Sequence, residues 1–309
     1  MIDVSNLQAL APVTFSSPLA GAALAVLLTA TAVPVLAFLR LCATRDKLMN
    51  ANLARQMFVL GCLLSTLTGF AGLLWLARMP RMPEALQEAA SGFSLGFSGY
   101  IWWHTPLRFN VILLGLICIA LIVLCYPLAY AWKRLDASPL KIWSGSIALV
   151  VLMPALWGTL IPLLRHVPFP AGASALLGEG SSLFLLAGIL LGAAIGLGGG
   201  AGFIWTLLRR DKNESPPGYE TFALHAESRM GTDGSLIMLA GLVALRISLN
   251  LPVLPGYAVL ALVLPAVAAL LFSISSRDMH PRRRAVFGLC GALLLVAGVM
   301  LLTHLLCLL

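Results

Sequence analysis

Residues 182–208 read Ser182-Leu-Phe-Leu-Leu-Ala-Gly-Ile-Leu-Leu-Gly-Ala-Ala-Ile-Gly-Leu-Gly-Gly-Gly-Ala-Gly-Phe-Ile-Trp-Thr-Leu-Leu208 and contain no charged side chain. A run of this length is long enough to cross, as a helix, the roughly 30 Å hydrocarbon core of a bilayer. Four of its glycines are spaced four apart and so share one face of that helix; they are Gly188, Gly192, Gly196 and Gly200. Such a stripe lets a second helix approach the backbone closely. The stretch predicts a membrane-spanning helix that packs inside a helical bundle.

The rest of the chain repeats this apolar pattern. Apolar residues make up 60% of the 309 residues and charged residues 10%, which is more apolar than a soluble globular domain needs. Continuous apolar runs predict helices rather than a β-barrel, because backbone groups in lipid must hydrogen-bond within their own segment. We therefore expect one all-α integral membrane domain over residues 1–309, a polytopic helical bundle. Its eight or so spans are expected at about residues 18–41, 55–77, 105–132, 142–164, 182–208, 234–252, 256–274 and 285–308.

Positive charge is concentrated in alternate connections between these spans. Fifteen of the twenty Lys and Arg residues fall within Arg40–Arg55, Lys133–Lys141, Arg209–Arg229 and Arg277–Arg284. Basic loops stay on the cytoplasmic side of a membrane, so this pattern predicts that both termini lie outside the cytoplasm. The net charge of +8 is then explained by topology and by contact with membrane lipids. We expect no nucleic-acid partner.

A polar stretch precedes the third predicted span: Gly99-Tyr-Ile-Trp-Trp-His-Thr-Pro-Leu-Arg-Phe-Asn110. Trp102 and Trp103 suit the bilayer interface, because an indole has an apolar body and one N–H group to keep hydrated. His104 and Arg108 are four residues apart, so they share a helix face if the helix begins near residue 106. This pair is suited to holding a polar headgroup beside an apolar slot. Simple interfacial anchoring by aromatic and basic residues is the alternative interpretation.

The predicted topology places further ionisable side chains on the outer side. These are Arg165 and His166 after the fourth span, Arg246 near the end of the sixth, and His304 in the eighth. If they converge with His104 and Arg108, two chemistries fit. A quinol needs hydrogen-bonding groups and a base that accepts its protons, which histidine supplies near neutral pH. Haem b needs two histidines on facing helices, and His104 or His166 with His304 would provide them.

Carboxylates are the residues that the predicted spans lack. All twelve lie outside the apolar runs, with Glu227 placed in a polar inside connection from Arg209 to Asp233. Ion-coupled transporters usually carry an acid within the membrane, because the coupling ion needs a group that binds it. The pattern therefore argues against a transporter driven by protons or sodium ions.

The layout resembles the NrfD-like and DMSO reductase anchor proteins, the membrane subunits of molybdopterin oxidoreductases. The matching parts are Leu74-Trp-Leu-Ala-Arg78-Met-Pro80 and the string His104, Pro106 and Arg108. The resemblance implies a subunit of a bacterial inner-membrane complex that binds menaquinone or ubiquinone near the outer face and carries no other cofactor. It also implies an iron–sulfur electron-transfer partner and a catalytic molybdopterin subunit. The quinone site would use Trp102, Trp103, His104, Arg108, Arg165, His166 and His304.

Two other interpretations stay open. One is a haem b subunit of a similar respiratory complex, with the histidine pairs named above. The other is a transporter or membrane assembly factor without a redox role. The first would show a haem absorption band, and the second would show neither haem nor redox partners.

Overall fold

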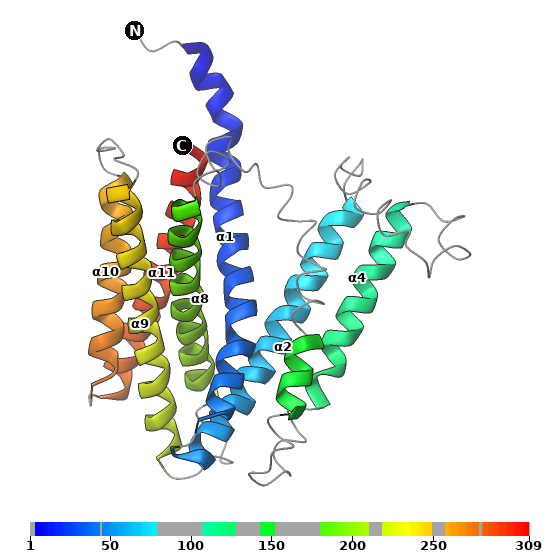
Figure 1. Ribbon diagram of the computed structural model, residues 1–309, viewed down its shortest axis with the longest axis vertical. Coiled ribbons are helices and arrows are strands. Elements are labelled where there is room, and N and C mark those ends of the chain that lie inside the picture. Colours follow the sequence, from blue (N-terminus) through cyan, green and yellow to red (C-terminus); the bar gives the residue numbers. More distant parts are fainter. Residues whose placement is uncertain are drawn as a thin grey trace. The chain divides into compact units, whose positions relative to one another are not determined.

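Every regular element that the computed structural model describes is a helix (Figure 1). The described residues are 4–43, 45–78, 107–127, 143–151, 180–209, 218–248, 257–277 and 280–308. The named helices are α1 (Val4–Leu41), α2 (Lys47–Arg78), α4 (Leu107–Leu124), α8 (Gly180–Leu208), α9 (Tyr219–Ser248), α10 (Tyr257–Ser275) and α11 (Pro281–Leu308), and residues 143–151 are also helical. The predicted all-α class is confirmed for this part of the chain.

Five helical segments in the described part are long and apolar enough to cross a membrane. They are Gly21–Leu41, Lys47–Ala71, Phe184–Leu208, Tyr219–Ile247 and Arg282–Thr303, and two shorter apolar helices cover Gly115–Leu124 and Val259–Ser275. Large apolar side chains project from the bundle, including Phe184 at 79% and Leu208 at 76% exposure. Water would oppose so much exposed apolar surface, whereas lipid does not. These helices indicate a multi-pass membrane protein.

The chain divides into two compact units. One contains Met1–Gly61 and Val167–Leu309, and the other contains Cys62–His166. Within the first unit α8 packs along α9, α10 packs against α9 and α11, and α1 packs against α8 and α11. Within the second, the buried face of α4 carries Cys118, Ile119 and Ile122.

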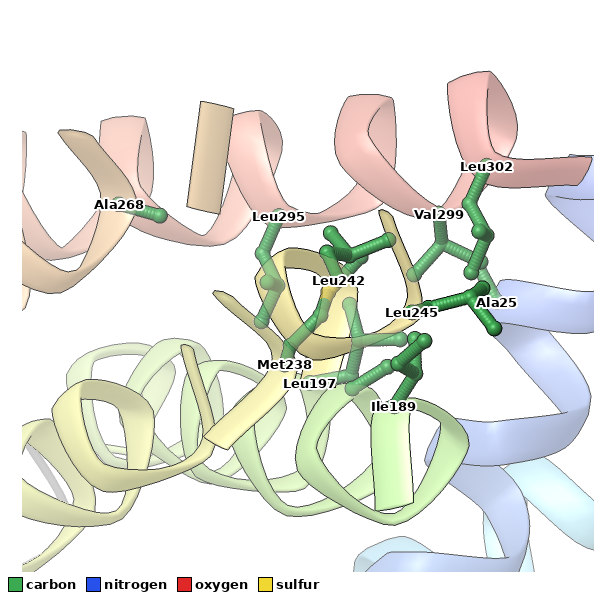
Figure 2. Packing of buried hydrophobic residues seen from close by; sticks show 11 residues of the cluster. Ala25, Ile189, Leu197, Met238, Leu242, Leu245, Ala268, Leu295, Val299 and Leu302 are labelled. Carbon is green, nitrogen blue, oxygen red and sulfur yellow. The ribbon is translucent and has the colours of Figure 1, made fainter. Parts of the chain in front are cut away.

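The core of the first unit is a cluster of apolar side chains from five helices (Figure 2). Ile189 on α8, Met238 on α9 and Leu295 on α11 are fully buried in it. Ala25 of α1 and Ala268 of α10 also belong to the cluster. Lipid tails are as apolar as these side chains, so close van der Waals packing rather than escape from water holds helices together in a membrane.

The predicted glycine stripe supplies that close packing at three of its four positions. A Cβ atom added at Gly192 would lie 2.9 Å from the carbonyl oxygen of Gly234 on α9. One added at Gly196 would lie 2.6 Å from Leu295, and one at Gly200 would lie 3.0 Å from a side chain of α11. Around Gly188 nothing comes within 4 Å. The prediction is therefore confirmed at Gly192, Gly196 and Gly200. At Gly188 no neighbouring helix in the described part of the chain approaches closely.

The predicted connection from Arg209 to Asp233 is wrong in its second half. The helix α9 begins at Tyr219 and continues without a break to Ser248. A helix of 30 residues is about 45 Å long, which exceeds the hydrocarbon core. Hydropathy detects only the apolar part of such a helix, so it assigns the polar first half to a loop. The same reason explains why α2 begins at Lys47 rather than near residue 55.

Candidate functional site

Most residues of the predicted outer site lie outside the described part of the chain. Trp102, Trp103, His104, Arg165 and His166 are all outside it. The backbones at Arg108 and His304 are helical, in α4 and α11 respectively, but their side chains are not among those described. Arg246 is half-buried in the last turn of α9. The convergence of Arg246 with His104, Arg108, Arg165, His166 and His304 therefore stays a prediction.

The described residues instead contain a buried polar cluster where α8 ends and α9 begins. Its central residue is Glu227 of α9, which is 1% exposed. Thr206 of α8, itself buried, donates a hydrogen bond from Oγ1 to Glu227 Oε1 over 3.1 Å. The other carboxyl oxygen, Oε2, has no hydrogen-bond partner among the described residues.

Two glycines of α8 make room for this carboxyl group. A Cβ atom added at Gly202 would lie 2.8 Å from Glu227 Oε1 and 3.2 Å from its carboxyl carbon. One added at Gly199 would lie 2.8 Å from the carbonyl oxygen of Glu227. The glycine-rich end of α8 therefore accommodates the acidic side chain and the α9 backbone together.

Two further polar atoms on α8 and α9 are buried without a hydrogen-bond partner in the described part of the chain. They are Oη of Tyr219, the first residue of α9, and Nε1 of Trp205, the neighbour of Thr206. Tyr219 is 2% exposed and close enough to Glu227 for their charges to interact. Arg209 covers the indole ring of Trp205, with its guanidinium carbon 4.7 Å from the ring centroid. This cation–π contact fixes a positive charge at the end of α8.

A cation from another helix, Arg40 in the last turn of α1, acts on Glu227. The two side chains interact electrostatically, although no ion pair within 4.0 Å joins them in the described structure. Arg40 is partly buried. A guanidinium at this position offers a counter-charge to an ionised Glu227 without pairing with it directly.

A separate set of hydrogen bonds joins the same half of α9 to α10. Ser275 Oγ donates to Ser228 Oγ over 2.9 Å, and both side chains are fully buried. His225 Nδ1 lies 2.9 Å from the carbonyl oxygen of Ser276, so that nitrogen carries the proton. These contacts join α9 to the end of α10.

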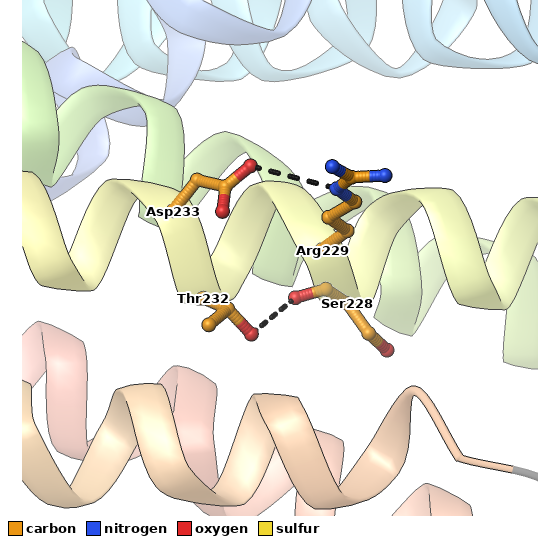
Figure 3. A network of polar contacts seen from close by, with 4 residues as sticks. All are labelled: Ser228, Arg229, Thr232 and Asp233. Atoms are coloured by element: carbon orange, nitrogen blue, oxygen red, sulfur yellow. Dashed lines mark hydrogen bonds and ion pairs between the residues drawn. The ribbon is translucent and has the colours of Figure 1, made fainter.

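An exposed face of α9 carries Arg229 and Asp233 (Figure 3). Arg229 Nε and Asp233 Oδ2 are 4.0 Å apart, and their side chains are 75% and 59% exposed. Thr232 Oγ1 donates to the carbonyl oxygen of Ser228 over 3.0 Å. An exposed pair of this kind contributes little to stability, so Glu227 and not Asp233 is the unusual carboxylate here.

The sequence contains one signal that marks this site. The sequence Pro216-Pro217-Gly218 is unfavourable for a helix and so indicates a boundary. Gly218 has a positive φ of 78°, a conformation that suits glycine. Buried residues then follow at Tyr219, Ala223, Ala226 and Met230, with a helical spacing of three or four. That spacing places Glu227 next to the buried stripe on the helix surface.

No group of three or more His, Cys, Asp or Glu side chains among the described residues is placed to hold a metal ion. The chemistry that the cluster offers is therefore that of a single buried carboxyl group with one hydrogen-bond donor and a nearby cation. Comparison with known proteins adds nothing to this geometry, since no protein-family model, curated protein or solved structure matches the chain.

Proposed function

We propose that this chain is the membrane-anchor subunit of a respiratory oxidoreductase complex, binding a quinone near the outer face of the membrane and exchanging electrons with an iron–sulfur partner. The observation that carries the proposal is a sequence pattern: Trp102, Trp103 and His104 come just before the apolar helix α4, and Arg108 is its second residue. The helix α4 begins at Leu107, so Arg108 belongs to its first turn. A charged donor at the end of an apolar helix suits a ligand with a polar head and an apolar tail.

The residue types fit the chemistry of a quinol. Its oxidation removes two electrons and two protons, so the site needs a group that accepts protons near neutral pH, and His104 is of that type. Arg108 would donate hydrogen bonds to a quinone oxygen. Trp102 and Trp103 would flank the headgroup at the membrane interface. His166, Arg165 and His304 complete the proposed site from later spans.

The proposed topology has about eight spans, with both termini outside the cytoplasm, in a bacterial inner membrane. Supporting it are the five long apolar helices and two shorter ones described above. The clustering of basic residues in alternate connections gives the orientation. In this orientation the buried cluster around Glu227 lies toward the cytoplasmic side, and the quinone site lies toward the opposite side.

The proposed partners are an iron–sulfur subunit and a catalytic molybdopterin subunit. Their support is the resemblance carried by residues 74–80 and by His104, Pro106 and Arg108. Purification of the native protein in a mild detergent tests this proposal directly. We expect mass spectrometry to identify both partners and the sample to reduce or oxidise a soluble menaquinone or ubiquinone analogue. Purification of the chain alone, without quinone-dependent electron transfer in membranes that contain it, would contradict the proposal.

An ion-coupled transporter is the second candidate, because of one specific observation. The sequence-based argument against it is the lack of a carboxylate in the predicted spans, whereas Glu227 is buried in the polar first half of α9, the helix that continues into a membrane-spanning segment. A buried acid is the group that such a transporter needs for its coupling ion. Reconstitution of the purified chain into liposomes distinguishes the two functions. A proton flux without any partner, lost in Glu227→Gln, would favour the transporter over the anchor subunit.

A further inference from the structure

Glu227 is distinguished from the other described carboxylates by its burial. Asp46 and Asp233 are exposed, and Glu220 is half-buried. Glu227 is 1% exposed, and its carboxyl group packs against Gly202 of α8. A carboxylate ion loses far more hydration than a neutral carboxyl group when it is buried in such a place. The packing therefore favours a bound proton.

The hydrogen bonding indicates which oxygen carries that proton. Thr206 Oγ1 donates to Oε1, so Oε1 acts as the acceptor. Oε2 accepts nothing from the described residues and is the atom left to bear the hydrogen of the neutral acid. Thr206 thus orients the carboxyl group and leaves Oε2 without a hydrogen-bond partner among the described residues.

Charged groups around the cluster are arranged to tolerate loss of the proton. Arg40 of α1 interacts electrostatically with Glu227, and Tyr219 lies between Glu227 and the exposed Gly218 along α9. Arg55 on α2 and Arg209 on α8 interact electrostatically with Tyr219, and Arg229 on α9 interacts with Arg40. The other titratable groups on this part of α9 are Glu220 and His225, and the neighbouring helix ends carry Arg277 after α10 and Arg284 in α11, joined by a hydrogen bond from Arg284 Nη2 to the Arg277 carbonyl oxygen. Arg40 is the cation that interacts with Glu227 itself, so it stabilises a negative charge there.

We propose that Glu227 is a proton-binding site that exchanges its proton with water at the end of the bundle where α8 ends and α9 begins. On release the O–H bond at Oε2 breaks and the proton passes to water. The carboxylate left behind keeps its hydrogen bond from Thr206 and gains Arg40 as counter-charge. The inference rests on the packing of α8 and α9 and does not depend on the proposed quinone function.

Labelling with dicyclohexylcarbodiimide tests the proposal on the full chain in detergent or liposomes. The reagent takes the proton of a neutral carboxyl group and adds to its oxygen, and the adduct rearranges to an N-acylurea without a leaving group. The peptide that contains Glu227 therefore gains the full mass of the reagent, which mass spectrometry locates. We expect labelling of Glu227 at neutral pH, a decline as the pH rises, and equal labelling in sodium and potassium buffers. Glu227→Gln removes the label, and Glu220→Gln on the same helix leaves it unchanged.

Infrared spectroscopy provides a second measurement that does not depend on access of the reagent. The wild-type spectrum should contain the C=O stretch of a protonated carboxyl group that Glu227→Gln lacks, and the band should shift when the protein is moved into D₂O. Absence of that band at neutral pH would overturn the proposal, since the carboxyl group would be ionised. A band that does not shift in D₂O would show a fixed structural proton. Protection from labelling by sodium but not potassium would identify a sodium site instead.

Discussion

Thr206 Oγ1 on α8 donates a hydrogen bond of 3.1 Å to Glu227 Oε1 on α9, and both side chains are buried. The two residues are 21 positions apart in sequence, on consecutive named helices joined by a connection. A buried hydrogen bond to a carboxyl group is strong enough to orient it. This contact therefore decides which carboxyl oxygen of Glu227 faces α8 and which is free to exchange a proton.

Replacing Thr206 by valine should make Glu227 hold its proton to higher pH. A donor to a carboxylate stabilises the ionised form, so its loss strengthens proton binding. A hydrogen bond to a charged group is worth about 1.5–3 kcal/mol, which corresponds to an upward shift of roughly one to two pH units. The midpoint of carbodiimide labelling against pH measures this shift. Thr206→Ser keeps the hydroxyl group and should keep the wild-type midpoint; equal midpoints for valine and threonine would show that the hydrogen bond is not formed.

Gly199→Ala should destabilise the bundle, whereas Gly188→Ala on the same helix should not. A Cβ atom at Gly199 would lie 2.7 Å from the backbone nitrogen of Gly231, and backbone atoms cannot move aside as a side chain does. Overpacking of this kind costs about 1–3 kcal/mol. The surroundings of Gly188 are open, and alanine favours a helix over glycine by up to about 1 kcal/mol. Thermal unfolding in detergent, followed by circular dichroism, should separate the two variants; a Gly199→Ala protein as stable as wild type would contradict the close approach of α8 and α9.

Ser228→Ala should lower stability more than Asp233→Ala, although both residues lie on the same part of α9. Ser228 receives a buried hydrogen bond from Ser275, and its loss should cost about 0.5–1.5 kcal/mol. The Arg229 and Asp233 side chains are mostly exposed, and their distance is 4.0 Å, so loss of that pair should change stability by less than about 0.5 kcal/mol. Denaturant titration of the two variants side by side makes the comparison. The reverse order would mean that the bond between α9 and α10 contributes nothing.

His104→Ala and Arg108→Ala should each abolish quinol oxidation while leaving the complex assembled. One removes the proposed proton acceptor and the other the proposed donor to the quinone oxygen, and loss of such a group lowers rates by about 100-fold or more. The measurement is quinol-dependent electron transfer in membranes, with partner subunits quantified in the same sample. His280→Ala is a matched control, because His280 is exposed in the connection before α11. Full activity in the double variant would disprove the quinone site.

The haem interpretation makes a separate spectroscopic prediction. If His104 or His166 binds haem b together with His304, the native protein should show a reduced-minus-oxidised band that disappears in His304→Ala. If the chain binds only a quinone, both proteins should lack the band, because quinones supply no haem absorption. Spectra of the purified complex, recorded with and without dithionite, decide between these outcomes.

Part of the architecture was predictable from local sequence. The span expected at residues 182–208 corresponds to α8 (Gly180–Leu208), and the one expected at 256–274 corresponds to α10 (Tyr257–Ser275). Both segments are apolar over almost their whole length, so hydropathy finds their ends. In contrast, α9 carries Glu220, His225, Glu227 and Arg229 in its first half, and hydropathy alone assigns such residues to solvent.

The structure does not test the predicted outer site. His104 and its tryptophan neighbours are outside the described residues. The resemblance to the anchor subunits and the quinone chemistry therefore stay predictions based on residue type and order. Their common physical basis is that aromatic and basic residues gather at membrane interfaces both for anchoring and for binding headgroups.

The sequence by itself determined that the chain forms apolar helices and that α8 presents small residues to a neighbour. Both are local properties, since hydropathy and glycine spacing depend only on residues within one segment. Only the tertiary structure decided that Glu227 is buried, because its burial requires Gly202 to leave space and Thr206 to donate from another helix. A polar residue next to an apolar stripe is equally compatible with solvent and with a helix interface. The crossing of α8 and α9 resolves that choice by bringing together residues that are far apart in the chain.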